Sequence, residues 1–335
     1  MMKQLRYFLL AAMSIWLSRN TSAQQFPMTD HYLVNPYSLT PATAGGTDKG
    51  ALFFNYRKDW LDFGKFSPET MRFNTHFHIG ANLFLGAEAF MDKVDILERF
   101  KGLVSLTYRL EMTENQFLHF GIWGSGYQNT VRVDNINGNI YDPLFRNLDQ
   151  LNGTTYNGGF GLVYYHNLFE TGLGMPTLFR TKDAYYNQSQ GRFAFEQEFL
   201  FHIANRFIIG TDWSLKPMLV ARRTTNTPTI VDLSAQLSYA DKFWISALYR
   251  NSQVVALGVG GELFNSMNFH YSYELGIGGI HHYGGGSHEI TIGFRFGQYQ
   301  QAEATPRQPK PGKHKNKRYM LHEYQQMYEQ KYRRN

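Results

Sequence analysis

Polar and apolar residues alternate one by one along most of this chain, most clearly in residues 289–296. If that segment is a β-strand, four large apolar side chains share one of its faces: Ile290, Ile292, Phe294 and Phe296. Successive side chains of a strand point to opposite sides, so a strand of this kind lies between two unlike environments. Many such segments in one chain are typical of a β-barrel with lipid outside and water inside.

Fourteen segments carry this alternation. The six most regular ones span residues 71–79, 104–112, 193–202, 231–239, 268–275 and 289–296, and eight less regular ones lie near residues 50–58, 82–91, 116–128, 156–166, 168–179, 206–216, 242–250 and 254–264. An even number of strands closes an antiparallel barrel and leaves both of its ends on the same, periplasmic side. The sequence therefore predicts an all-β fold, a transmembrane antiparallel outer-membrane β-barrel of about 14 strands over residues 48–298. A soluble all-β protein is the alternative, and it is disfavoured because its surface would expose too many aromatic side chains.

The first 23 residues have the composition of a cleavable secretory signal. Lys3 and Arg6 precede a short apolar stretch, and small residues lead up to Gln24, where we expect the mature chain to begin. Residues 24–47 then form an N-terminal segment that is a candidate for the barrel lumen. The chain contains no cysteine, which excludes disulfides, thiolate metal sites and a thiol-linked lipid anchor.

The positive charge of the chain lies mainly in a C-terminal tail, residues 299–335. Residues 302–335 contain nine Lys or Arg and three Glu, whereas residues 24–301 contain 21 basic and 24 acidic residues, which argues against nucleic-acid binding. Residues 319–332 of this periplasmic tail are predicted to form a short helix with one apolar face: Leu321, Tyr324, Tyr328 and Tyr332. We expect this face to dock on a periplasmic partner, and the alternative is a solvated tail that binds nothing.

The face of the barrel opposite the lipid is expected to carry charges of both signs. These residues are Arg72, Glu88, Arg109, Glu111, Glu196, Glu198, Asp212, Lys216, Asp232, Arg250, Glu274 and Arg295. If they pair across the lumen, side chains close the barrel, and if they do not, they line a water-filled channel. The sequence alone leaves both possibilities open.

Several short motifs stand outside the simple alternation. In chain order they are Asn35-Pro36, Pro41-Ala42-Thr43-Ala44-Gly45, Asn55-Tyr56-Arg57, Gly172-Leu173-Gly174-Met175-Pro176, Tyr271-Ser272-Tyr273-Glu274 and Gly286-Ser287-His288-Glu289-Ile290. Together they resemble the PorP/SprF family of outer-membrane proteins, which belongs to the type IX secretion and gliding-motility machinery. The resemblance covers about residues 24–298, and its last two motifs are the most specific. Three positions differ from the family pattern, because Thr40, Gly174 and Glu274 stand in place of Asn, Ser and Asp.

The resemblance implies a barrel that assists export or surface delivery of cargo such as adhesins and that couples to periplasmic machinery. Its implied partners are other type IX secretion components, either translocon or periplasmic ring proteins, together with secreted cargo and outer-membrane lipid. The resemblance implies no catalysis and no cofactor. A general outer-membrane pore or small-solute transporter is the alternative function.

Two other interpretations of the C-terminal motif are disfavoured. A metal site would use polar residues of this motif and of the preceding loop: His281, His282, His288 and Glu289. The run of glycines between them, however, would hold no fixed geometry. Ser287, His288 and Glu289 are the residue types of a hydrolytic triad, but neighbours on a strand point to opposite faces.

Overall fold

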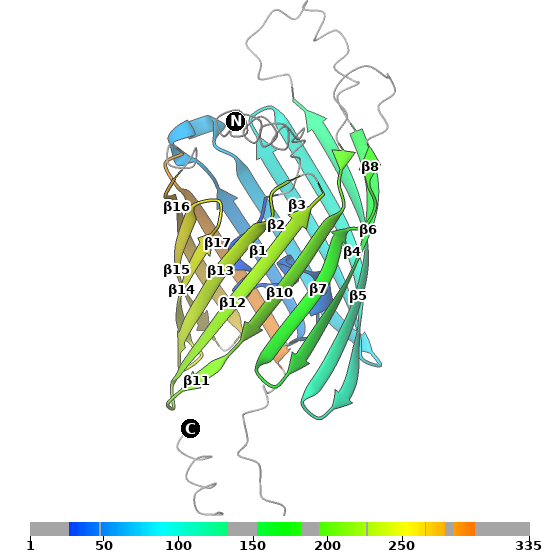
Figure 1. Ribbon diagram of the computed structural model, residues 1–335, viewed down its shortest axis with the longest axis vertical. Coiled ribbons are helices and arrows are strands. Elements are labelled where there is room, and N and C mark those ends of the chain that lie inside the picture. The colour runs from blue at the N-terminus through cyan, green and yellow to red at the C-terminus, as the bar shows by residue number, and fades with distance from the viewer. Residues whose placement is uncertain are drawn as a thin grey trace, which may run out of the picture. The chain divides into compact units, whose positions relative to one another are not determined.

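The computed structural model describes residues 27–46, 48–132, 153–182, 194–225, 227–264, 266–278 and 284–298. The chain divides into two units, residues 1–299 and 300–335, and the second lies outside the described residues. Within the first unit, antiparallel strands form one closed sheet (Figure 1).

Fourteen of the described strands form the closed ring. They are β1 (Asp48–Lys58), β2 (Glu69–Gly80), β3 (Leu83–Val94), β4 (Leu97–Thr113), β5 (Gln116–Val131), β6 (Gly153–His166), β7 (Phe169–Thr177), β10 (Glu198–Asn205), β12 (Trp213–Thr224), β13 (Ile230–Tyr239), β14 (Phe243–Arg250), β15 (Val254–Leu263), β16 (Met267–Gly276) and β17 (Ser287–Gln298). Three short strands complete the described set: β8 (Thr181–Lys182), β9 (Ala194–Phe195) and β11 (Phe207–Ile209). Pairing of β1 with β17 and of β10 with β12 closes the ring. The predicted all-β barrel of about 14 strands is therefore confirmed.

The short strand β11 continues β10 and does not add a further member to the ring. Ala204 of β10 pairs with Met218, and Phe207 of β11 pairs with Leu215, so both strands keep the same register on β12. Pro217 lies on β12 opposite the break. Because proline has no backbone N–H to donate to the ladder, the pairing lapses at this level.

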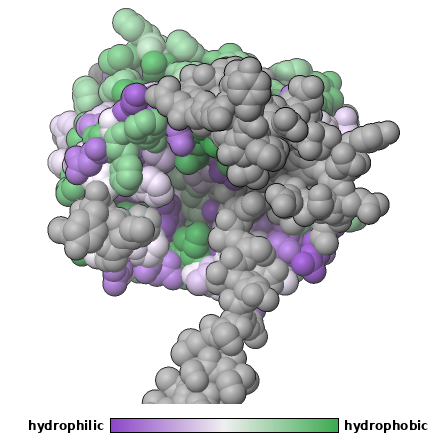
Figure 2. Space-filling view, turned by 90° about the horizontal axis from the view of Figure 1, so that it is seen from above, coloured by the Kyte–Doolittle hydropathy of each residue, from purple (hydrophilic) through white to green (hydrophobic). Residues whose placement is uncertain are grey.

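The alternation seen in the sequence separates the outer face of the barrel from its lumen. On β5, Ile122 points outward and is 61% exposed, whereas its neighbour Trp123 is 6% exposed. Seen end-on, hydrophobic residues gather along the upper part of the outer edge (Figure 2). An outer face of this kind suits surrounding hydrocarbon, and the polar residues of each strand are turned inward.

In the described part of the chain, no helix is both long enough and apolar enough to cross a membrane.

The two ends of the barrel differ in the length of their connections. At one end, named here the short-turn end, β2–β3 and β13–β14 turn within a few residues, and β1 begins and β17 ends. Ala81 and Asn82 have positive φ there, as do Ala240 and Asp241, and type I′ hairpin turns require this at both central residues. The opposite, long-loop end carries longer connections, among them the loop that contains the 3-10 helix η4 (Leu61–Phe66).

Two details differ from the segments predicted above. The segment predicted over residues 206–216 contains a turn, because β12 begins only at Trp213. Asp212, predicted to face the lumen, lies exposed in that turn. In the segment predicted over residues 193–202, the alternation places Phe195 on the apolar, outward face. Phe195 is nevertheless 8% exposed, because β9 pairs with β8 in a separate two-stranded sheet. Its ring packs against that of Tyr127, with 4.5 Å between the ring centroids.

Candidate functional site

Residues 27–46 lie inside the ring of strands and are named here the lumenal segment. They form three short 3-10 helices: η1 (His31–Leu33), η2 (Pro36–Ser38) and η3 (Pro41–Thr43). Pro36 and Pro41 each begin a helix, where the ring fixes φ and the missing N–H costs no hydrogen bond. Side chains of the segment are largely buried against the wall. The segment is therefore a compact, separate body within the barrel.

One carboxylate anchors the segment near the long-loop end. Asp30 accepts a hydrogen bond from Arg57 of β1 at 2.7 Å and one from Arg250 of β14 at 2.9 Å. The backbone N–H of Asp30 donates to Oε2 of Glu289 at 2.9 Å. Burial opposes the ionisation of Asp30, but the two guanidinium groups outweigh it and hold the pKa of this carboxyl below its ordinary value. Asp30 is thus a charged ligand of the wall.

The wall around Asp30 supplies further charges, and together they form the charged cluster. Its members are Asp30, Arg57, Asp232, Arg250, Glu274 and Glu289. Arg57 also contacts Glu274 at 2.8 Å and Glu289 at 3.0 Å. Arg250 also contacts Asp232 at 2.8 Å. Buried charges need such partners because isolated ones would be strongly destabilising. The charged cluster therefore fixes the segment to β1, β13, β14, β16 and β17.

His31 adds a neutral, hydrogen-bonded contact beside the charged cluster. Its Nδ1 lies 2.8 Å from Oγ1 of Thr291, and its Nε2 lies 2.7 Å from Oγ of Ser272. Burial lowers the pKa of His31 to about 3. The carboxylate of Asp30 opposes this shift, and the guanidinium of Arg57 adds to it by a smaller amount. At neutral pH the imidazole is therefore uncharged.

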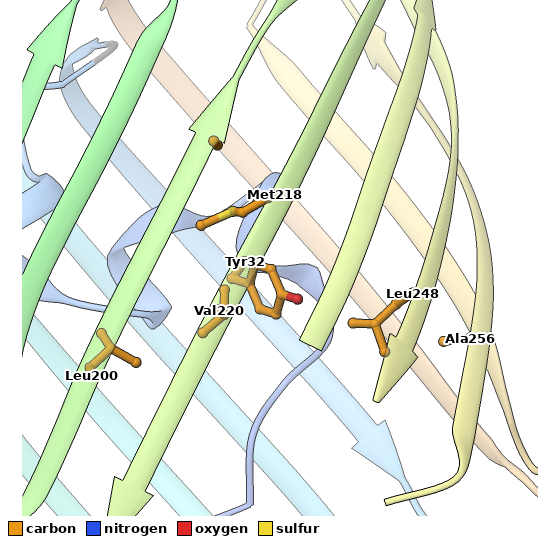
Figure 3. Packing of buried hydrophobic residues seen from close by; sticks show 7 residues of the cluster. Tyr32, Leu200, Met218, Val220, Leu248 and Ala256 are labelled. Atoms are coloured by element: carbon orange, nitrogen blue, oxygen red, sulfur yellow. The ribbon is translucent and has the colours of Figure 1, made fainter. Parts of the chain in front are cut away.

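Tyr32 occupies an apolar part of the lumen that borders the charged cluster. Its ring belongs to a cluster of buried hydrophobic residues, whose other members come from β10, β12, β14 and β15 (Figure 3): Leu200, Ala204, Met218, Val220, Leu248 and Ala256. Its hydroxyl lies 3.3 Å from Oγ of Ser234 and 3.5 Å from Asp232. The segment thus touches the wall on its apolar side as well as at the charged cluster.

Glycines of the wall make room for the second half of the segment. A Cβ atom added to Gly121 would lie 2.7 Å from Cα of Ala42, and one added to Gly161 would lie 2.8 Å from Oγ1 of Thr40. Both distances are too short for unbonded atoms. Nearby, the hydroxyl of Tyr37 hydrogen-bonds Oγ of Ser105 at 2.7 Å. The wall is therefore shaped to the segment at β4, β5 and β6.

The motif residues of the segment have identifiable structural roles. Asn35 is buried, and Pro36 and Pro41 begin helices η2 and η3. Gly45 has φ of +78°, and a Cβ there would collide with the ring of Phe84. Only glycine fits both constraints at this position.

The two C-terminal motifs divide between the faces of the barrel. Ser272, Glu274 and Glu289 face the lumen and contact the segment or Arg57, and Ser287 is also buried. This arrangement joins motifs that lie more than 200 residues apart in the chain.

The other motif residues lie on the outer face near the long-loop end. The hydroxyl of Tyr271 is 2.7 Å from Nδ1 of His288, and the hydroxyl of Tyr273 donates to the carbonyl of Gly285 at 3.1 Å. Gly286 has φ of +82°, which favours glycine. Since His288 faces away from the lumen, it cannot join its neighbours in a hydrolytic triad.

The remaining candidate residues are outside this geometry. Leu321, Tyr324, Tyr328 and Tyr332 lie outside the described residues, as do His281 and His282. Among the residues that the structure describes, no three His, Asp or Glu side chains are grouped so as to hold a metal ion.

Several of the inward charges predicted from the sequence are paired in the lumen. Arg72 lies 3.8 Å from Glu88, and Lys216 lies 2.9 Å from Glu170. Together with the charged cluster, these pairs favour a lumen occupied by protein groups over a channel lined by free charges.

Asp30 and His31 bind the wall of the barrel, and the sequence patterns did not single them out. The signal that could have found them is composition, because Asp30 is the only charged residue among positions 24–47. A single acid within an otherwise uncharged lumenal candidate calls for a buried cationic partner.

The motifs that meet in the lumen belong to a chain that matches a known protein family. Residues 21–294 match the family model described as type IX secretion system membrane protein PorP/SprF. The chain belongs to the PorP/SprF family. It is accordingly an outer-membrane component of the type IX secretion system, and other components of that system are its associates.

Several solved structures show a weaker likeness to the PorP/SprF barrel. Omp33 of Acinetobacter baumannii is 8% identical over 75% of this chain and 99% of that chain, with a TM-score of 0.42. The CymD monoaromatic hydrocarbon channel is 10% identical over 81% and 94%, with a TM-score of 0.48. The toluene transporter TbuX of Ralstonia pickettii is 11% identical over 79% and 93%, with a TM-score of 0.45. A search of curated proteins gave no match.

Proposed function

We propose that this PorP/SprF barrel assists the export or surface delivery of cargo such as adhesins and couples the type IX apparatus to periplasmic machinery. The observation that carries the proposal is the meeting of the family motifs at one site. Asp30 lies two residues before Tyr32, which contacts the apolar part of the wall. Asp30 is bound by Arg57 of the Asn55-Tyr56-Arg57 motif and by Glu289 of the final motif. In this chain, residues of the family motifs thus hold a segment in the lumen, which suits a gated or scaffolding component better than a passive pore.

The lengths of the connections support one orientation of the barrel in the membrane. Outer-membrane barrels have short periplasmic turns and longer extracellular loops. We therefore place the short-turn end, where β17 ends at Gln298, in the periplasm. Residues 299–335 would then begin on the periplasmic side, where their basic charge and the apolar face of residues 319–332 could contact a ring or translocon protein. No catalytic role is part of the proposal.

A pull-down from outer membranes in mild detergent tests the proposal. With a tag after Asn335, we expect the full chain to recover other type IX components. A chain that ends at Gln301 and carries the same tag should lose the periplasmic partner and keep the barrel. A matched variant of full length, with Leu321, Tyr324 and Tyr328 changed to Ala, separates the apolar face from the basic charge. Recovery of the barrel alone from every form would contradict the coupling role.

Channel recordings in planar bilayers address the alternative function. If the protein is a general pore, the wild-type chain should conduct ions. If the lumenal segment fills the barrel, the wild-type chain should conduct few ions. Large, steady wild-type conductance would favour the pore or small-solute transporter.

A further inference from the structure

The wall of the barrel holds the lumenal segment by its main chain at four places. The wall side chains Arg295, Arg72, Thr107 and Arg109 donate hydrogen bonds to the carbonyl oxygens of Val34, Ser38, Pro41 and Gly45, respectively. Three of these bonds measure 3.0 Å, 3.0 Å and 3.4 Å, for Arg72, Thr107 and Arg109. Every peptide has carbonyl oxygens, so donors of this kind recognise a chain whatever its side chains are.

The four acceptors are spread over residues 34–45 of the segment, and their donors come from β2, β4 and β17. They form a track of donors that follows the segment through the lumen, named here the carbonyl track. Between described residues, the backbone–backbone hydrogen bonds of the segment all stay within the segment. The ring of strands also closes without any residue of the segment. The segment is therefore bound as a ligand and is no part of the sheet.

Three further contacts give the track a preference for certain side chains. Arg57 and Arg250 bind one carboxylate, that of Asp30. The apolar wall around Leu200 and Met218 takes an aromatic ring two positions later, that of Tyr32. The close approach of Gly121 then requires a small residue twelve positions after the acid, where Ala42 lies.

We propose that the lumen is a peptide-binding site and that the lumenal segment is its resident occupant. The expected ligand is a peptide segment of another chain whose backbone is not paired in a β-sheet. It carries an acidic residue, an aromatic residue two positions after the acid, and small residues about twelve positions after the acid. This inference rests on the proposed function, since a secretion component handles polypeptides, and it names the feature by which a polypeptide is recognised. An incoming segment takes the place of residues 27–46.

The tether to β1 gives the resident segment a strong advantage over a free peptide. A short covalent connection keeps the resident segment at a high effective concentration, in about the millimolar range. A free peptide should therefore bind poorly until the resident segment is released. Asp30→Lys provides that release, because it places a cation against Arg57 and Arg250 and leaves every wall residue of the site unchanged.

The test uses the full chain in detergent and a fluorescent peptide with the sequence of residues 27–46. We expect the peptide to bind the Asp30→Lys protein at least tenfold more tightly than the wild type, measured by fluorescence anisotropy. A peptide with Asn at the position of Asp30 should bind at least tenfold more weakly, and a scrambled peptide should not bind. Asp62→Lys is the matched control, because Asp62 is exposed in the η4 loop outside the lumen, and this protein should behave as wild type.

A second variant covers the case in which the resident segment stays bound in the lumen despite Asp30→Lys. A protease site is inserted between Gly46 and Asp48, and cleavage makes residues 27–46 a non-covalent peptide. We expect the cleaved segment to exchange with the labelled peptide and not with its scrambled version. Failure of both forms to take up the peptide, or equal uptake of the scrambled peptide, would overturn the proposal.

Failure here is distinguishable from failure of the proposed function. The pull-down reports association with secretion components through any surface, including residues 299–335. A barrel that recovers those components and takes up no peptide would retain its proposed place in the apparatus and lose only the lumenal peptide site.

Discussion

Replacing Asp30 by Asn should release the lumenal segment measurably. The change keeps the shape of the side chain and removes the charge that Arg57 and Arg250 share at 2.7 Å and 2.9 Å. Removing one partner of a buried ion pair costs about 3–5 kcal/mol. The lower end applies because Arg57 keeps Glu289 and Arg250 keeps Asp232. A cost of about 3 kcal/mol raises the population of released segment roughly 150-fold.

The absence of cysteine makes this population easy to measure. Thr43 is 6% exposed inside the barrel, and Thr43→Cys places a single thiol there. Its reaction rate with a maleimide tracks the open population when reclosing is fast. We expect the rate to rise roughly 100-fold with Asp30→Asn and to stay unchanged with Asp62→Asn, an exposed acid outside the lumen. A rise below about threefold would refute the view that the Asp30 charge holds the segment.

Two further predictions concern the fit and the protonation of the segment. Gly121→Val should displace Ala42, since a Cβ on Gly121 would already lie 2.7 Å from Cα of Ala42. The displacement should raise ion conductance in planar bilayers. Gly124→Val is the control and should leave the conductance unchanged, because it lies on the outer face of the same strand and an added Cβ there meets nothing. Acid should also loosen the segment, because binding in the lumen lowers the pKa of His31 from 6.5 to about 3. The contribution of His31 to the stability of the bound segment is complete above pH 6.5 and decreases as the pH falls towards 3. At pH 5 the loss is about 2 kcal/mol, seen as faster thiol labelling; His31→Asn should flatten this dependence, and an equally steep profile in that variant would contradict the assignment.

The period of the sequence determined the barrel because its physical cause is local. Successive side chains of a strand face opposite sides, so the alternation in residues 289–296 already separates an apolar face from a polar one. The same logic failed at residues 206–216 and at Phe195. There a turn and a separate two-stranded sheet interrupt the strand, and nothing in the pattern of single residues marks the interruption.

The sequence by itself determined the fold class, the approximate number of strands and, through its motifs, the family. Only the tertiary structure decided that Asp30 meets Arg57, Arg250 and Glu289, because these contacts join positions up to 259 residues apart. Alternation fixes which way a side chain points, but pairing across a lumen depends on the register of every strand between the partners. The closure of the ring brings the first and last strands together, and with them the two ends of the family pattern.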